Sequence, residues 1–171
     1  AEYGKTLIDH IQAYLYAKKE WNPREENAFT PALCNRIDRN TGGIVIAAKN
    51  AEALRILNQK IKDREIKKRY LCIVHGTLNP PSGKLEGFLF KDAVKNRVYV
   101  TSKPQKGAKT ALTYYRTIRT KGNLSLVECE FLTGRTHQIR AQMQAAGHPL
   151  LGDGKYGKLG KQYGRKFQAL Y

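Results

Sequence analysis

The sequence predicts an α+β domain whose mostly antiparallel mixed sheet is flanked by helices. Three observations lead to this prediction. Apolar residues recur at helical spacing near the N-terminus, short β-rich runs separated by turn residues fill the central region, and a further helical pattern follows the last of these runs. Helices around a series of hairpin-linked strands are typical of the α+β class. The 171 residues contain no internal repeat or linker, so we expect a single domain over residues 1–171.

The N-terminal part predicts two helices and one short strand. Apolar residues between positions 7 and 15 lie at the spacing of one helical face. A charged stretch at residues 18–27 is expected to be a loop, and the apolar run at residues 44–48 to be a strand. Asn50 is the expected N-cap of a second helix, which ends near residues 63–65.

The C-terminal part predicts several strands and one more helix. Residues 70–75 form a β-rich run, and four more strands are expected at residues 84–90, 96–102, 111–120 and 124–132. A hairpin turn at residues 121–123 joins the last two. Thr136 is expected to open the third helix, and Gly147 to end it. The residues expected on its apolar side are Ile139, Met143 and Ala146.

The charge balance predicts a nucleic-acid partner. Thirty-one Lys and Arg residues face 14 Asp and Glu residues, which gives a formal net charge of +17. Such a surplus opposes compaction, and counterion release from phosphates is the usual force that brings basic proteins to RNA or DNA. A solubilising surface is the alternative. No signal peptide or membrane-spanning run is found in the sequence, so a cytoplasmic setting is expected.

The cysteines predict neither a disulfide framework nor a metal site. Cys34, Cys72 and Cys129 form no C-x-x-C pair, their number is odd, and each lies beside apolar residues. Buried reduced thiols are therefore expected. A metal-dependent nuclease would need clustered acidic ligands, and the sparse Asp and Glu residues do not group in that way.

A carboxylate between two arginines is the first candidate for chemistry. Asp38 lies between Arg36 and Arg39, directly before a Thr-Gly-Gly turn. Nearby positive charges favour the ionised form of a carboxylate, which makes it a poor general acid near neutral pH. The residues alone leave three roles open for Asp38, namely nucleophile, base, or one half of a structural ion pair.

Two later segments add an aromatic ring and two arginines. Tyr70 stands at the entrance of a strand beside basic residues, which suits either a packed core edge or stacking on an unpaired base. Arg135 precedes the N-terminus of the third helix, where backbone N–H groups favour a phosphate. Arg140 lies on that helix next to its apolar side, so it is expected to pair with an acid. His10 and His75 fit structural positions better than acid–base roles.

Four motifs in order resemble the RluA-type pseudouridine synthases. R-[IL]-D-x-x-T-[SG]-G occurs at residues 36–43 and K-x-Y-x-x-x-V-x-G at residues 68–76. T-G-R-x-H-Q-I-R occurs at residues 133–140 and G-x-P-x-x-G-D-x-x-Y-G at residues 147–157. The resemblance covers residues 29–157, most of the chain.

The resemblance implies a cofactor-free RNA isomerase with the family's catalytic fold. Asp38 resembles the nucleophile that attacks C1′ of the ribose or the uracil ring, and Arg140 the arginine that pairs with it. Tyr70 resembles the ring that stacks on the target uracil and assists the final proton transfer. Arg36 resembles the residue that fills the space left by the extruded uridine. The residues expected to contact RNA are Arg36, Arg39, Lys68, Arg69, Arg135, His137 and Gln138.

The expected partner is RNA. The protein is expected to act on it as a monomer, without a metal or a small-molecule cofactor. The lead-in at residues 29–34 is most similar to enzymes that modify 23S large-subunit ribosomal RNA, and a transfer-RNA enzyme of the same family is an alternative. A basic RNA-binding module without turnover, on the same scaffold, is the other alternative.

The chain departs from the family pattern in three places. Asn35 stands where the family usually carries His, which should adjust RNA contact without abolishing the chemistry. The family's N-K-P-x-G strand and S4-type RNA-binding domain are not found ahead of residue 29, and residues 167–171 resemble the start of a further strand. We therefore expect a catalytic domain that is incomplete at both ends.

Overall fold

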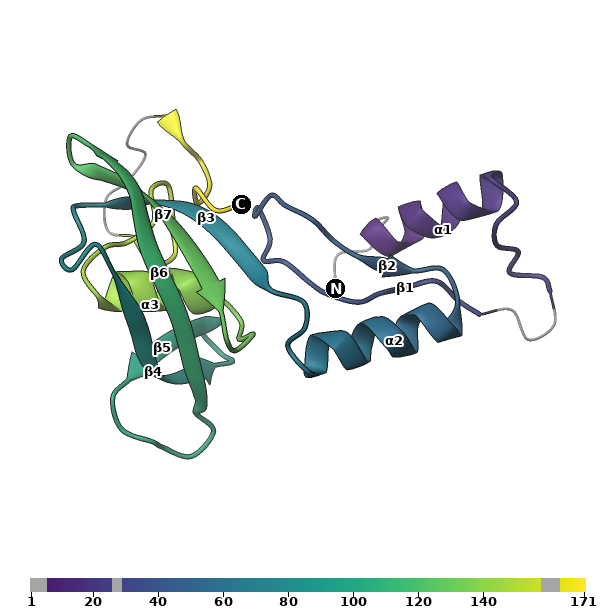
Figure 1. The fold of residues 1–171 in the computed structure, drawn as a ribbon, viewed down its shortest axis with the longest axis horizontal. Coiled ribbons are helices and arrows are strands. Elements are labelled where there is room, and N and C mark those ends of the chain that lie inside the picture. The colour runs from purple at the N-terminus through teal and green to yellow at the C-terminus, as the bar shows by residue number, and fades with distance from the viewer. Residues whose placement is uncertain (1–5, 26–28, 158–163) are drawn as a thin grey trace. The chain divides into compact units, whose positions relative to one another are not determined.

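The computed structural model describes residues 6–25, 29–157 and 164–171 (Figure 1). These residues form two compact units, which we treat individually. The N-terminal unit comprises residues 1–37 and 43–66, and the sheet unit comprises residues 38–42 and 67–171.

The N-terminal unit contains two capped helices and a short ribbon. Its elements are α1 (Leu7–Ala17), β1 (Ala32–Leu33), β2 (Ala47–Ala48) and α2 (Ala51–Lys62). The Thr6 side chain accepts a hydrogen bond from the Asp9 N–H, and Asn50 accepts one from the Ala53 N–H, so each helix begins at a side-chain cap. Both predicted helices and the predicted N-cap at Asn50 are confirmed.

The strand predicted at residues 44–48 is shorter than expected. Only Ala47–Ala48 pairs with β1, in antiparallel register. Just before it, the Asn35 side chain accepts a hydrogen bond from the Ile46 N–H at 2.7 Å and donates one to the Ile44 carbonyl at 3.2 Å. A side-chain amide therefore satisfies backbone groups that a ladder would otherwise pair, and the strand begins later.

The sheet unit is built on five antiparallel strands in the order β3-β7-β6-β4-β5 (Figure 1). Their bounds are β3 Lys68–His75, β4 Ser82–Asp92, β5 Arg97–Thr101, β6 Lys109–Lys121 and β7 Leu124–Phe131. Each predicted strand of this region is present. Lys121 pairs with Leu124 across the predicted hairpin turn, in which Gly122 adopts the positive φ of 56° that glycine tolerates.

One face of this sheet is covered by α3 (Gln138–Ala145). Ile139 and Met143 of α3 belong to one buried cluster, with Cys72, Val74, Leu78, Val127, Cys129 and Leu150. Ala141 of α3 joins a second cluster, with Leu89, Val98, Ala111 and Tyr156. Full burial of a Val or Leu side chain is worth about 1.5–3 kcal/mol, so these two clusters fix the helix on the sheet. We call the face that carries them the inner face.

The third helix begins two residues later than predicted. Thr136 and His137 form a turn, and His137 is the N-cap in the left-handed region, at φ 53°. The end is as predicted: Gly147, at φ 85°, donates to the Gln144 carbonyl, and the His148 N–H bonds the Met143 carbonyl at 2.8 Å. This pair of bonds is a Schellman motif.

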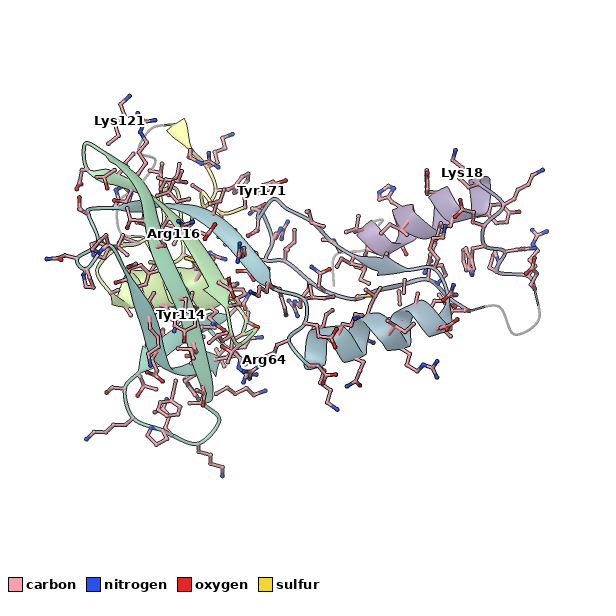
Figure 2. The ribbon with its side chains drawn as sticks, viewed as in Figure 1. Lys18, Arg64, Tyr114, Arg116, Lys121 and Tyr171 are labelled. Atoms are coloured by element: carbon pink, nitrogen blue, oxygen red, sulfur yellow. The ribbon has the colours of Figure 1, made fainter. Side chains whose placement is uncertain are left out.

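The last residues of the chain pair with the outer edge of β3. Leu71 and Tyr171 exchange two backbone hydrogen bonds of 2.7 and 2.9 Å, and Ile73 donates to the Ala169 carbonyl at 3.1 Å. Tyr171 is labelled in Figure 2. The strand character predicted for residues 167–171 is confirmed for this pairing, which brings the C-terminal segment beside the loop that carries Asp38.

Candidate active site

Asp38 lies in a tight turn of the sheet unit. The Thr41 N–H donates to the Asp38 carbonyl at 3.0 Å, and Asn40 between them has φ 65°. Thr41 is buried, and Gly42 donates its N–H to the Leu170 carbonyl at 3.3 Å. The turn is therefore fixed at its C-terminal end. At its start, the Asp38 side chain is 17% exposed.

A buried glutamine of the C-terminal segment holds the same turn. The Gln168 amide donates to the Arg39 carbonyl at 2.7 Å and to the Thr41 hydroxyl at 3.2 Å. Gln168 is 5% exposed, so these bonds are shielded from water. A residue 130 positions away thus positions the candidate nucleophile, and no local sequence signal indicated this.

Arg140 connects Asp38 to a second carboxylate. Its Nη1 atom lies 3.6 Å from Oδ2 of Asp38, while Nε and Nη2 donate to the two oxygens of Asp153 at 2.7 and 2.9 Å. The sequence predicts an acidic partner for Arg140, and the structure provides two, Asp38 and Asp153. The bidentate contact with Asp153 is the closer one, and it fixes the plane of the guanidinium.

Asp153 is a residue of this site that the sequence reasoning did not assign. Its side chain is fully buried, and Oδ1 also accepts the backbone N–H groups of Lys155 and Tyr156. Burial alone would raise the pKa of Asp153, but the hydrogen bonds and charge of Arg140 lower it below its usual value. The signal was present, because Asp153 is the aspartate of the fourth motif.

The charge of Arg140 is stabilised by the same contacts. Burial alone would lower the pKa of Arg140, yet the hydrogen bonds to Asp153 and the charges of Asp153 and Asp38 raise it above its usual value. Arg140 is therefore a permanent cation facing Asp38.

Tyr70 lies at the start of β3 on the inner face. Its ring packs against Phe131 with a centroid distance of 4.8 Å and a tilt of 48°. Burial raises the pKa of the Tyr70 hydroxyl, and the negative charge of Asp38 raises it further. Tyr70 is thus a protonated phenol that is close enough to Asp38 to be influenced by its charge.

His137 is held by Tyr156 of the fourth motif. The His137 Nδ1 and the Tyr156 hydroxyl are 2.9 Å apart, and that hydroxyl accepts the Val98 N–H at 2.9 Å. Burial lowers the pKa of His137, against the opposing charge of Asp38, which favours a neutral imidazole near pH 7. Tyr156, like Asp153, belongs to the fourth motif, for which the sequence predicts no individual roles.

Gln138 has a structural position. It is 1% exposed; its amide oxygen accepts from the Thr133 hydroxyl and the Arg135 N–H, and its amide nitrogen donates to Leu112 O and Thr113 Oγ1. An amide offers two donors and two acceptor positions, and all four are used inside the protein. We therefore assign Gln138 to holding the turn of the third motif instead of the RNA contact expected from the sequence.

Residues of all four motifs therefore meet in one site. The profile of the RNA pseudouridylate synthase family matches residues 7–145. The chain belongs to this family. The resemblance to RluA-type members is confirmed, and the α+β fold is the one expected from it.

Curated relatives in the family are longer than this chain. The ribosomal large subunit pseudouridine synthase D of Borreliella burgdorferi is 38% identical over 134 residues, which are 78% of this chain and 40% of the relative. The ribosomal large subunit pseudouridine synthase C of Escherichia coli K12 is 34% identical over 125 residues, 73% of this chain and 39% of the relative. The matched region thus spans about two fifths of each.

Two solved structures share the fold. Human RNA pseudouridylate synthase domain containing 1 superposes with a TM-score of 0.71 at 26% identity, over 82% of this chain and 61% of the other. Human RNA pseudouridylate synthase domain containing 4 has a TM-score of 0.73 at 21% identity, over 97% of this chain and 65% of the other, and at that identity it supports the fold alone.

The other residues expected to contact RNA lie on different elements. Arg39 and Arg135 are exposed in the sheet unit, and Lys68 begins β3. Arg69 projects from the opposite face of β3, where it forms a 3.0 Å ion pair with Glu130, so the structure does not bring it to Tyr70. Arg36 is exposed in the N-terminal unit.

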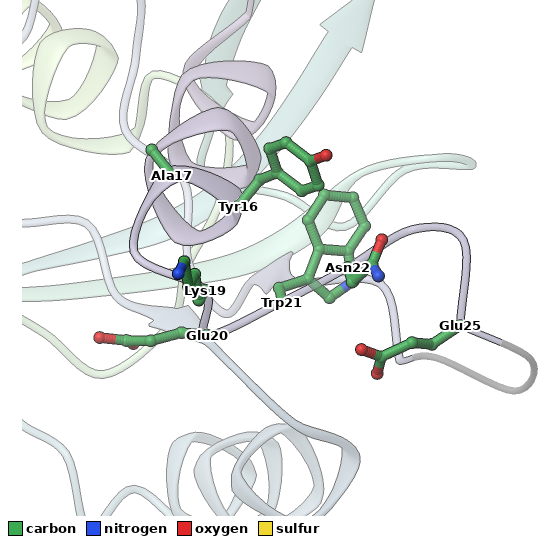
Figure 3. A pocket seen from close by; sticks show the side chains of 7 residues that line it. All are labelled: Tyr16, Ala17, Lys19, Glu20, Trp21, Asn22 and Glu25. Carbon is green, nitrogen blue, oxygen red and sulfur yellow. The ribbon is translucent and has the colours of Figure 1, made fainter.

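Other features of the described residues lie outside this site. A hollow of about 510 Å³ in the N-terminal unit contains no motif residue (Figure 3); it is lined by Tyr16, Ala17, Lys19, Glu20, Trp21, Asn22 and Glu25. Cys72 and Cys129 are buried free thiols 3.9 Å apart, as predicted, whereas Cys34 is a free thiol that is only half-buried.

The described ranges contain no helix long and apolar enough to cross a membrane, and His, Cys, Asp and Glu side chains do not gather there in threes as metal ligands would.

Proposed function

We propose that this chain is the catalytic part of an RNA pseudouridine synthase, which isomerises specific uridines to pseudouridine with Asp38 as nucleophile. The observation that carries the proposal is the Asp38–Arg140 pair, at 3.6 Å, in the same site as a protonated Tyr70. The charge of Arg140 favours the ionised carboxylate that such a nucleophile requires.

The reaction is an exchange of one bond for another. Asp38 attacks C1′ of the ribose or the uracil ring, the C1′–N1 bond breaks, and the uracil turns so that C5 faces C1′. A C5–C1′ bond then forms, and the bond between Asp38 and the substrate breaks, which returns the free carboxylate. The proton on C5 leaves, and N1 takes up a proton. Atoms and electrons balance, so the step itself needs no oxidant, reductant or energy source.

Each neighbour of Asp38 has a role in this scheme. Arg140 keeps the carboxylate ionised and aimed, and Asp153 in turn fixes Arg140. The Tyr70 ring stacks on the extruded uracil, and its protonated hydroxyl assists the proton transfer at C5. Arg39, Lys68, Arg135 and His137 contact the RNA around the extruded nucleotide, and Arg36 fills the space that it leaves.

The proposed substrate is 23S large-subunit ribosomal RNA. Two relatives at 34–38% identity carry names that refer to the large ribosomal subunit, and the net charge of +17 suits a large polyanion. A transfer RNA is the alternative substrate within the family. A monomer, a cytoplasmic setting and the absence of a cofactor stay predictions.

The test is the release of tritium from RNA labelled at C5 of uracil. We expect wild-type protein to release tritium from ribosomal RNA, and Asp38→Asn to lose this activity by roughly 10³-fold or more while still binding RNA, because the amide is not a nucleophile. Asp63→Asn, which changes an exposed carboxylate at the end of α2, is the matched control and should retain full activity.

A non-catalytic RNA-binding module is the second reading, and the same experiment separates the two. Tight RNA binding by the wild-type protein without tritium release from ribosomal or transfer RNA would favour the module. Full activity in Asp38→Asn would remove Asp38 as the nucleophile.

A further inference from the structure

A small hollow lies at the end of the sheet where the third motif begins. It has a volume of about 190 Å³ and is bounded by β4, β5, the loop before β6, and the turn at Arg135 and Thr136. Lys91, Lys109 and Arg135 line it, and none of its lining residues, all of which the structure describes, is acidic.

The two lysines lie on the inner face of the sheet, at positions where its neighbouring residues are apolar. Lys91 is two residues beyond Leu89 on β4 and therefore projects from the same face. Lys109 of β6 lies directly opposite Leu89, and Val98 of β5 lies directly opposite Lys91. Leu89 and Val98 are 5% and 4% exposed and belong to the core beneath α3. The inner face thus changes from apolar to cationic beyond the helix.

The arginine of the hollow is held in place. The Arg135 Nε atom donates to the Thr110 carbonyl at 3.1 Å, which uses one of the five guanidinium donors. Next to it, a Cβ atom placed on Gly134 would lie 3.6 Å from the Lys68 ammonium, so a fourth cation approaches the same turn. Cations gathered without an acid repel one another, and binding of an anion would offset that repulsion.

The size of the hollow limits how large a bound anion can be. Ligand pockets for whole small molecules measure about 300–1,000 Å³, so a hollow of this size suits a phosphate group better than a base with its sugar. The segment that contains Lys91 and Lys109 is also basic, since residues 91–109 contain six Lys and Arg residues but one acidic residue. A phosphate within a longer polyanion fits this setting better than an isolated ion.

We infer that this hollow binds a backbone phosphate of the RNA strand whose target uridine reaches Asp38. The inference rests on the proposed function and adds a binding subsite to it. The third motif connects the two places, because Arg135 lines the hollow and Arg140, five residues later, contacts Asp38. A strand held at the hollow is thereby positioned relative to the nucleophile by one rigid turn and helix.

The first test compares two double variants with the same change of charge. Lys91→Gln with Lys109→Gln removes the lysines of the hollow, and Lys121→Gln with Lys166→Gln removes two exposed lysines elsewhere in the sheet unit. For a ribosomal RNA fragment that contains the target, we expect the first pair to raise Kd about 10-fold and to reduce the slope of log K against log salt by about 1.4. The control pair should change Kd less than about 2-fold.

The second test locates the phosphate. Single phosphates of the RNA fragment are replaced in turn by neutral methylphosphonate. We expect one position at which the replacement weakens binding to the wild-type protein but not to Lys91→Gln/Lys109→Gln. Equal losses in both double variants, or the lack of such a position, would overturn the inference.

A third measurement separates RNA from a free anion and from the proposed function. If the hollow binds inorganic phosphate in the wild-type protein, loses it in Lys91→Gln/Lys109→Gln, and RNA affinity is the same in both, the hollow is a free-anion site and the inference fails. These binding measurements do not depend on tritium release, so loss of the proposed catalysis and loss of this subsite are distinguishable.

Discussion

At the scale of single residues, Arg140 serves two carboxylates in different ways. Its Nε and Nη2 atoms are bound at short distances to Asp153, and Nη1 lies 3.6 Å from Asp38. A nucleophile held by a short bidentate contact would have its lone pairs occupied by donors. The longer contact supplies positive charge to Asp38 while the strong hydrogen bonds go to Asp153.

Arg140→Met is expected to impair both stability and turnover. It leaves the fully buried Asp153 carboxylate without its counter-charge, and breaking a buried pair in this way costs about 3–5 kcal/mol. Urea unfolding measures the loss of stability, and tritium release measures turnover under conditions in which the variant is folded. Arg119→Met, at an exposed position of β6, is the control. An unchanged rate would remove Arg140 from the mechanism.

Tyr70 offers a ring and a hydroxyl, which two substitutions separate. Tyr70→Phe keeps the ring and its packing on Phe131, so we expect RNA affinity within about 2-fold of wild type and slower tritium release. Tyr70→Leu also removes stacking, worth about 1–3 kcal/mol per base, and should weaken binding to the target RNA. Equal affinity in both variants would argue against stacking.

The pH profile gives an additional check on Tyr70. Burial and the charge of Asp38 both disfavour the phenolate, so the pKa of Tyr70 is raised above its ordinary value of about 10. The hydroxyl therefore keeps its proton as the pH rises from 7 to 9. A fall in the rate over this range that disappears in Tyr70→Phe would contradict this.

At the scale of elements, the C-terminal segment acts as a support for the candidate nucleophile. Backbone bonds tie it to β3, while Gln168 reaches the Asp38 turn. The segment therefore holds the Asp38 loop in a fixed position relative to β3. This arrangement explains how an irregular turn can hold a reactive carboxylate in place.

Gln168→Ala is expected to loosen that turn. The substitution removes two hydrogen bonds at a buried position, at a cost of about 1–3 kcal/mol. We expect a roughly 10-fold lower rate of tritium release with RNA affinity little changed, because the loss concerns the aim of Asp38. Gln144→Ala, at an exposed position of α3, is the control. A wild-type rate in Gln168→Ala would show that the turn holds its own shape.

The sequence predicted the elements whose signals are local. The caps predicted at Asn50 and Gly147, the strands of the sheet unit and the Gly122 turn each depend on neighbouring residues, and they recur in the structure. The third helix began later than predicted because His137 takes a left-handed conformation that its neighbours do not require. The contact of Gln168 with the Asp38 turn depends on tertiary packing alone, and no short pattern encodes it.

The candidate site was predicted only in part, because some of its contacts also depend on tertiary packing. The family resemblance pointed to Asp38, Tyr70 and Arg140. The structure pairs Arg140 with Asp38 and places Tyr70 within reach of the charge of Asp38. Asp153 was missed as the main partner of Arg140, because a charge pattern cannot tell which of several acids a buried arginine reaches. The sequence predicts an RNA contact for Gln138, because a sequence does not distinguish a buried, fully bonded amide from an exposed one.

At the scale of the whole molecule, the two faces of the sheet carry different charged groups. On the face opposite α3, Arg69 pairs with Glu130 and Arg116 with Glu128, and Arg116 is visible there on β6 (Figure 2). Both of these β7 acids therefore offset cations on that face. The inner face carries the Asp38 site and the cationic hollow, which makes it the side expected to meet RNA.

The surplus predicts a steep dependence of RNA binding on salt. Each phosphate that a lysine or arginine neutralises contributes about −0.7 to the slope of log K against log salt for a single strand and about −0.9 for a duplex. With a net charge of +17, contacts to several phosphates are expected, so affinity should fall by orders of magnitude between low and physiological salt. Filter binding or fluorescence anisotropy over a salt series measures the slope.

The same salt series also separates binding from chemistry. RNA without a target uridine should show a similar slope, because phosphate contacts carry no sequence information. Asp38→Asn removes one negative charge close to the RNA but no phosphate contact, so its slope should match that of wild type. Once RNA is saturating, the rate of tritium release should depend on salt far less than the affinity does. A flat slope for wild-type protein would mean that the positive charges do not contact RNA, and it would contradict both the RNA partner and the phosphate subsite.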